Sequence, residues 1–242
     1  AVPASPGGAT TGAAGARFLE TPAFEALESE LADLDTSDFL VPAPTDATRD
    51  VPEAQRAGCV SQQDSRDVVE CEFGDPAGEV TVVTIGDSKN LQWSDALIPI
   101  AEREGWRLVT FYKSACAFTE PAYELADRRI EYCAAWNLEA LDRLLEIDPD
   151  VVVTTGRGVI DGSVDGDRDP GARMIATWWQ HLHDAGITVI PLLDNPAPPF
   201  EVYECIAEHP ETHSACSFDR EDAVHSSGAE YQLLAAEMVG IE

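Results

Sequence analysis

Positive charge is scarce in this sequence. Its 242 residues include 15 Lys and Arg against 45 Asp and Glu, which gives a formal net charge of −30 at pH 7. A basic face that binds nucleic acid needs clustered Lys and Arg to neutralise phosphates, and docking on anionic lipid headgroups needs the same residues. The composition therefore excludes a nucleic-acid surface and disfavours a lipid-docking one. Self-repulsion among so many carboxylates favours a monomer and is screened best by salt, which fits a salty or extracellular setting.

Long hydrophobic runs are also absent. A membrane-spanning helix needs about 18 or more apolar residues, whereas the longest candidates here are short stretches such as residues 80–85. With 44% hydrophobic residues the chain can still bury a core, and its length fits one α/β domain of roughly 180 residues plus an accessory segment. The chain begins with Ala1 and no apolar signal-peptide core precedes it, so we expect a processed or excised piece of a longer protein.

No CxxC motif occurs, and no Cys/His cluster has the spacing of zinc ligands. Six cysteines allow fifteen pairings, so sequence alone does not fix their connectivity. They nevertheless fall into three sequential couples, which favours local disulfides in an oxidising compartment over a metal site; six buried free thiols are the alternative. The three couples are Cys59 with Cys71, Cys116 with Cys133, and Cys205 with Cys216.

One acidic segment has a faint likeness to a calcium loop. It contains Asp161, Asp165, Asp167 and Asp169 but lacks the terminal Glu at the spacing that such a loop requires. The segment is therefore typical of a solvated loop, and we expect neither a metal nor a cofactor.

The chain divides by composition. Residues 1–16 are almost all Ala, Gly, Pro, Ser and Thr, which is typical of a flexible linker. Helical spacing of apolar residues predicts an acidic helix over residues 17–34, and prolines interrupt the stretch that follows. We therefore expect a linker over residues 1–57 and a packed catalytic domain over residues 58–242.

Beyond that point, β-branched runs alternate with helical patterns. The sequence predicts strands over residues 79–85, 107–112, 150–155 and 187–193, and helices over residues 91–104, 127–146, 173–185 and 228–239. Such alternation is typical of parallel βαβ units with right-handed crossovers. The predicted fold is therefore α/β, a three-layer α/β/α sandwich with a parallel sheet.

A candidate nucleophile follows the first of these strands. Ligands of an open parallel sheet bind at the carboxyl ends of its strands, and here the strand leads into Gly86-Asp87-Ser88. Gly86 permits a tight turn, and Ser88 would begin a helix, where backbone N–H groups stabilise negative charge. Ser88 is therefore the candidate nucleophile. Helix capping is the alternative role, because Ser and Asp cap helices routinely.

A candidate base stands near the C-terminus. Asp222 precedes His225 by three residues, so its carboxylate can reach Nδ1 within one turn and leave Nε2 to accept the serine proton. Together with Ser88, these two residues predict a catalytic triad. For His225 the alternative is a solvated or capping histidine. The other four histidines lack this arrangement: His181, His183, His209 and His213.

The combination of strand, GDS and helix with a later DxxH resembles the SGNH (GDSL-like) hydrolases. Residues 86–93, Cys116 and residues 194–196, with the last two cysteines, resemble more narrowly the extracytoplasmic SGNH domains appended to membrane acyltransferase-3 proteins. The resemblance covers roughly residues 59–238. It implies the SGNH hydrolase fold with a flavodoxin-like sheet.

The resemblance also implies a role for each site residue. Ser88 would be the nucleophile, His225 the general base and acid, and Asp222 the residue that orients His225, while Asp87 would brace the nucleophile turn. An oxyanion hole in this family uses the serine N–H, a glycine after the second strand and an asparagine after the third.

The sequence departs from that oxyanion pattern twice. Residues 113–116 (KSAC) contain no glycine, and residues 155–158 (TGRG) contain no asparagine. We therefore take the backbone near Ala115 and Gly156, together with the Arg157 side chain, as candidate donors beside the N–H of Ser88. A surface salt bridge is the alternative for Arg157.

The function implied is acyl transfer through a covalent ester on Ser88. The narrower resemblance implies O-acetylation of an extracytoplasmic glycan, with an acyl donor, a glycan acceptor and an upstream membrane acyltransferase domain to which residues 1–16 would be the linker. The alternatives are a secreted carbohydrate O-acyl esterase and a catalytically silent glycan-binding module. We expect a location at the cell surface or outside the cell.

Overall fold

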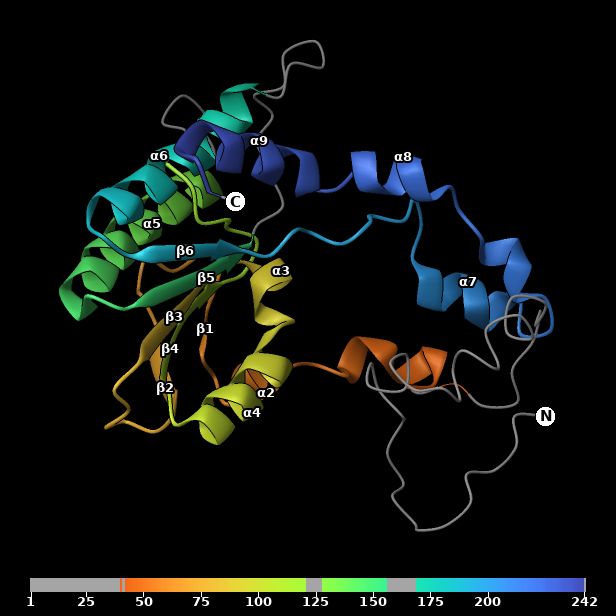
Figure 1. Ribbon diagram of the computed structural model, residues 1–242. Coiled ribbons are helices and arrows are strands. Elements are labelled where there is room, and N and C mark those ends of the chain that lie inside the picture. The colour runs from red at the N-terminus through yellow and green to blue at the C-terminus, as the bar shows by residue number, and fades with distance from the viewer. Residues whose placement is uncertain (1–39, 41, 121–127, 156–168, 242) are drawn as a thin grey trace, which may run out of the picture. The chain divides into compact units, whose positions relative to one another are not determined.

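The computed structural model describes residues 40, 42–120, 128–155 and 169–241 (Figure 1). By their contacts the residues form two units, which are described separately. The larger unit is Val51–Ala197 with Arg220–Glu242, and the smaller unit is Ala1–Asp50 with Pro198–Asp219. The acidic helix expected over residues 17–34 lies outside the described residues, and the domain boundary expected at residue 58 stays a prediction.

A six-stranded sheet forms the centre of the larger unit (Figure 1). Its order is β1-β4-β3-β5-β6, and β2 pairs with β4 as well. Every pairing is parallel except that of β2 with β4. The strands are β1 Val60–Ser61, β2 Glu70–Gly74, β3 Thr81–Gly86, β4 Arg107–Lys113, β5 Val151–Thr155 and β6 Thr188–Pro191.

Helices cover both faces of the sheet. The helices of the larger unit are α2 Glu53–Arg56, α3 Ser88–Leu91, α4 Ser94–Glu104, α5 Arg128–Ile147, α6 Asp169–Asp184, α8 Arg220–His225 and α9 Ala229–Val239. Val83 and Val109 pack in one apolar cluster with residues of α5, α6 and α9. Val82 and Leu108, which alternate with them along the strands, pack with α4 in a second cluster on the other face. This arrangement confirms the predicted three-layer α/β/α fold.

Two features of the larger unit differ from the sequence prediction. The helix predicted over residues 91–104 is divided into α3 and α4, because the chain turns at Gln92 and Trp93. The strands β1 and β2 precede the first predicted strand. Gly105 ends α4 in a left-handed conformation with φ 67°, as its position in the sequence predicts.

The smaller unit contains short helices. They are η2 Pro44–Arg49, α7 Val202–Glu208 and η4 His213–Cys216. A disulfide between Cys205 and Cys216 joins α7 to η4, with Cα atoms 5.8 Å apart.

The other two disulfides lie in the larger unit. Cys59 pairs with Cys71 and Cys116 with Cys133, so all three bridges join sequential cysteines, and none of the six is a free thiol. Three disulfides fit an oxidising, extracytoplasmic compartment. In the parts of the chain described, no helix combines the length and the apolar character needed to cross a bilayer.

Candidate active site

Ser88 lies at the carboxyl end of β3, the strand between β4 and β5. It is the first residue of α3 and is exposed. Asp87 is buried and caps the helix: its carboxylate accepts a hydrogen bond from the Lys89 N–H at 2.9 Å. Within the described part of the chain no acceptor takes the Ser88 backbone N–H, so that donor is available to a ligand.

The turn that presents Ser88 is tightly constrained. A Cβ on Gly86 would lie 2.6 Å from the backbone oxygen of Thr155 and 2.9 Å from Asn90 Cβ, so the close packing of β3, β5 and α3 requires glycine here. Asn90 is fully buried, and its amide donates to the Val153 carbonyl at 3.3 Å. The neighbouring strand therefore fixes the position of Ser88.

His225 is the last residue of α8, which also contains Asp222. Its Nδ1 lies 3.2 Å from a carboxylate oxygen of Glu230, on α9, and its side chain is 68% exposed. Glu230 was not a candidate from sequence, because the turn between α8 and α9 decides which carboxylate reaches this ring. Among the described residues no hydrogen bond joins the Ser88 hydroxyl to His225, so the triad stays a prediction.

The turn after β4 is the second candidate oxyanion element. Ala115 is exposed and has φ 50°, the left-handed region that glycine favours. It therefore adopts a conformation typical of the glycine that the resemblance leads one to expect. The Ser114 N–H donates to the Ser61 carbonyl at 3.0 Å, which ties this turn to β1.

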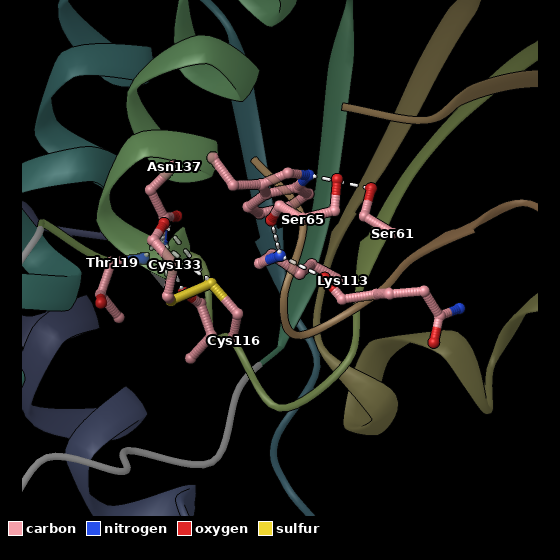
Figure 2. Close-up of a disulfide and its surroundings, with 10 residues drawn as sticks. Ser61, Ser65, Lys113, Cys116, Thr119, Cys133 and Asn137 are labelled. Atoms are coloured by element: carbon pink, nitrogen blue, oxygen red, sulfur yellow. Dashed lines mark hydrogen bonds between the residues drawn. A yellow bond between two sulfur atoms is a disulfide. The ribbon is translucent and has the colours of Figure 1, made fainter. Parts of the chain in front are cut away.

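A buried lysine joins the end of β4 to the segment that follows β1, as Figure 2 shows. Lys113 Nζ donates to the carbonyls of Gln62 and Ser65, each at 2.6 Å. Burial lowers the pKa of this ammonium, while Asp64 and Asp67 raise it by a smaller amount. The lysine thus serves to fasten the loop between β1 and β2 to the end of β4.

The disulfide Cys116–Cys133 fastens the turn to α5 (Figure 2). Asn137 is buried beside it, and its amide donates to the carbonyls of Ala117 and Cys133 at 3.1 and 3.2 Å. Its side-chain oxygen accepts the Thr119 N–H at 3.3 Å. The segment that follows Ala115 is therefore held by a covalent bond and by a satisfied amide.

Several other candidates from sequence lie outside the described residues. These are Gly156 and Arg157 of the oxyanion hypothesis and, from the acidic segment, Asp161, Asp165 and Asp167. The fourth residue of that segment, Asp169, is the first residue of α6. Among the residues whose placement is described, no group of three or more His, Cys, Asp or Glu side chains could hold a metal ion.

A mainly parallel sheet with a GDS turn at the end of its central strand is the arrangement expected of an SGNH-type domain. A family model described as an SGNH domain fused to AT3 domains matches residues 58–239. The chain therefore belongs to this family. No curated protein matches the chain.

Two solved structures are similar to this chain. One is the periplasmic domain of a lipopolysaccharide acetyltransferase from Salmonella ser. Paratyphi A, with 13% identity and a TM-score of 0.46 over 95% of this chain and 79% of that one. The other is the acetyl xylan esterase AlAXEase, with 14% identity and a TM-score of 0.37 over 67% of this chain and 75% of that one.

Proposed function

We propose that this chain is a serine-dependent acyl-transfer domain that places an acetyl or similar small acyl group on an extracytoplasmic glycan. The exposed hydroxyl of Ser88, on a fixed turn at the carboxyl end of the central strand, carries the proposal. Family membership supports a membrane acyltransferase domain as the partner upstream that delivers the acyl group. The three disulfides support an extracytoplasmic location.

In the first half of the reaction, Ser88 Oγ attacks the carbonyl carbon of the acyl donor. His225 Nε2 accepts the serine proton, and the carbonyl oxygen becomes an oxyanion. The N–H of Ser88 and a backbone N–H of the Ala115 turn hold that oxyanion, where each such donor is worth roughly 3 kcal/mol. The bond to the leaving alcohol then breaks, His225 returns the proton to it, and an acyl ester remains on Ser88.

In the second half, a glycan hydroxyl gives its proton to His225 and attacks the acyl-Ser88 carbonyl. Collapse of the second oxyanion transfers the acyl group to the glycan and restores the Ser88 hydroxyl, which takes the proton back from His225. When water takes the place of the glycan the same steps make an esterase. Both halves require His225 Nε2 to come within about 3 Å of Ser88 Oγ once substrate is bound.

Labelling with a fluorophosphonate tests the nucleophile. We expect mass spectrometry to find the label on Ser88, no label in Ser88→Ala, and labelling slowed by about 10²-fold or more in His225→Ala. Ser217→Ala removes an exposed serine of the smaller unit and serves as the matched control, with labelling unchanged. Folded wild-type protein that takes no label would contradict the proposal and favour the silent glycan-binding module.

Transfer and hydrolysis are separated by a second assay. The protein is incubated with an activated acetyl ester, with and without a glycan acceptor, and the glycan mass and free acetate are measured. An acetylated glycan whose formation requires Ser88 identifies the transferase, whereas free acetate alone identifies the esterase.

A further inference from the structure

The loop after β6 contacts both segments that carry the proposed catalytic residues. On one side, the Gln92 side-chain amide, just beyond α3, donates to the Asn195 side-chain oxygen at 2.9 Å. On the other side, the Ala197 N–H donates to the carbonyl of Ala223 in α8 at 2.8 Å. Residues 192–197 therefore bridge the serine turn and the DxxH helix.

Asp194 is the centre of this loop, and its side chain is 0% exposed. One carboxylate oxygen, Oδ2, accepts the N–H of Gly228 at 2.9 Å. The other, Oδ1, lies 3.8 Å from Nζ of Lys89. Lys89 follows Ser88 directly and Gly228 comes three residues after His225, so one carboxylate contacts the neighbours of both proposed catalytic residues.

Gln232 completes the buried cluster. Its side-chain oxygen accepts the N–H of Asp194 at 2.7 Å. Its amide donates to Thr155 Oγ1 at 3.1 Å and to the Leu192 carbonyl at 2.8 Å. The first turn of α9 is thereby fastened to the carboxyl ends of β5 and β6, and the backbone of Asp194 is fixed.

Burial of a carboxylate costs free energy unless an opposite charge and hydrogen bonds replace its contacts with water. Here the compensation is incomplete, because Oδ1 of Asp194 accepts no hydrogen bond within the described residues and faces only the Lys89 ammonium. Apolar packing does not explain why a carboxylate is buried at this position. Its contacts instead go to two backbone segments whose relative position the proposed reaction depends on.

We propose that Asp194 is a positioning residue that holds the Ser88 turn and the segment after His225 in a fixed relation. This inference rests on the proposed function. It adds a residue that touches neither the acyl group nor the reacting atoms and acts through Lys89 and Gly228.

Asp194→Ala is the main test, and Asp150→Ala is the matched control. Asp150 also accepts a backbone N–H from a distant part of the chain, that of Thr81 at 2.8 Å, but at the amino ends of the strands. For Asp194→Ala we expect kcat for an activated acetyl ester, and the rate of Ser88 labelling, to fall by about 10²-fold with KM unchanged. Asp150→Ala should change neither rate.

Amide hydrogen exchange provides a readout that does not depend on activity. Asp194→Ala should speed exchange in peptides covering residues 88–93 and 225–232 together, because the common anchor of both is lost. Asp194→Asn keeps an oxygen for the Gly228 N–H but removes the charge that faces Lys89. It should speed exchange at residues 88–93 only, and it keeps the test available if the alanine variant does not fold.

The outcomes separate the two proposals. If both Asp194 variants have the activity and the hydrogen exchange of the wild-type protein, the inference is overturned. The proposed function would still be supported by labelling of Ser88 in the wild-type protein. The inference would also be overturned if Asp194→Ala slows catalysis but speeds hydrogen exchange in just one of the two segments. Loss of a common anchor must speed exchange in residues 88–93 and in residues 225–232. Wild-type protein that takes no label would overturn the proposed function and the positioning role with it, even where exchange shows that Asp194 joins the segments.

Discussion

At the scale of single residues, the carboxylate observed at His225 Nδ1 belongs to Glu230, whereas the resemblance assigns that place to Asp222. A carboxylate at Nδ1 makes that nitrogen the donor and directs Nε2 toward a proton acceptor role. The side chain of Glu230 is 37% exposed, and an ion pair in contact with water contributes little free energy. Substitutions of Asp222 and of Glu230 should therefore lower kcat by different amounts.

We expect Asp222→Asn to lower kcat by about 10²-fold or more, since loss of the orienting carboxylate of a serine triad has a large effect. Glu230→Gln should lower kcat by no more than about fivefold, the equivalent of an exposed pair worth up to about 1 kcal/mol. Steady-state kinetics with an activated acetyl ester measure both. The reverse order would identify Glu230 as the carboxylate that orients His225.

Ala115 gives a prediction about stability. A left-handed conformation costs an L-residue roughly 1–2 kcal/mol, and glycine avoids this cost but gains about 0.5–1 kcal/mol of chain entropy in the unfolded state. Ala115→Gly should therefore raise the free energy of unfolding by up to about 1.5 kcal/mol and preserve Ser88 labelling. Asp148→Gly, at the other described non-glycine residue with positive φ, 52°, is the control. A large loss of labelling in Ala115→Gly would contradict a role limited to its backbone.

At the scale of elements, the β3–α3 turn should not accept a larger residue. In Gly86→Ala the new Cβ would meet the Thr155 backbone oxygen at 2.6 Å, and overpacking of this kind typically costs 1–3 kcal/mol. We expect urea unfolding to show that loss together with slower Ser88 labelling. Gly105→Ala is the control, because a Cβ there meets nothing within 4 Å and should lower stability while leaving labelling intact. Unchanged labelling in Gly86→Ala would show that the turn tolerates displacement.

Tyr112, on strand β4, makes the free energy of unfolding depend on pH. The ring is fully buried and its hydroxyl contacts Thr84 Oγ1 at 3.4 Å. Burial raises the pKa of this phenol far above its ordinary value of 10.0. The unfolded chain therefore ionises this tyrosine first, so stability present below pH 10 is lost as the pH rises further, at up to about 1.4 kcal/mol per pH unit.

Tyr112→Phe should remove that alkaline loss. The lowered pKa of Lys113 acts in the opposite sense up to pH 10.5, its ordinary pKa, so the free energy of unfolding is compared above that pH. Equal slopes in the wild-type protein and in Tyr112→Phe would show that the pKa of Tyr112 does not differ between the folded and unfolded states.

The elements predicted from sequence are those whose pattern is local. The runs that became β3, β4 and β5 are continuous and apolar because both faces are buried, and this signal survives without tertiary context. In contrast, β1 and β2 are two and five residues long, and β2 includes Glu70 and Glu72, so only pairing with β4 defines them.

In the candidate site, too, the sequence predicts only the residues whose pattern is local. Ser88 is predictable because a strand, a glycine and a helix meet within a few residues. Glu230 and Asp194 are not, since their roles depend on the turn between α8 and α9 and on the path of the loop after β6. Asp194 was part of the residues that carry the resemblance, but its burial and its contacts with Lys89 and Gly228 required coordinates.

At the scale of the whole molecule, the net charge of −30 is the dominant electrostatic property. Like charges that folding brings close together repel one another, and unfolding relieves this repulsion by separating them. Added salt shortens the screening length from about 10 Å at 0.1 M to about 3 Å at 1 M, which reduces the repulsion between exposed carboxylates. Stability should therefore depend on ionic strength.

We expect the free energy of unfolding in urea to rise as NaCl increases from 0.05 to 1 M. Glu139 and Asp142 are exposed on α5, three residues apart, where a like-charge pair costs about 0.2–0.5 kcal/mol. Replacing them by Gln and Asn should stabilise the protein at low salt by about that amount and change nothing at high salt, because screening already removes the repulsion. Stability that falls with added NaCl, or a double variant equally stabilised at both salt concentrations, would show that packing rather than charge repulsion controls the effect.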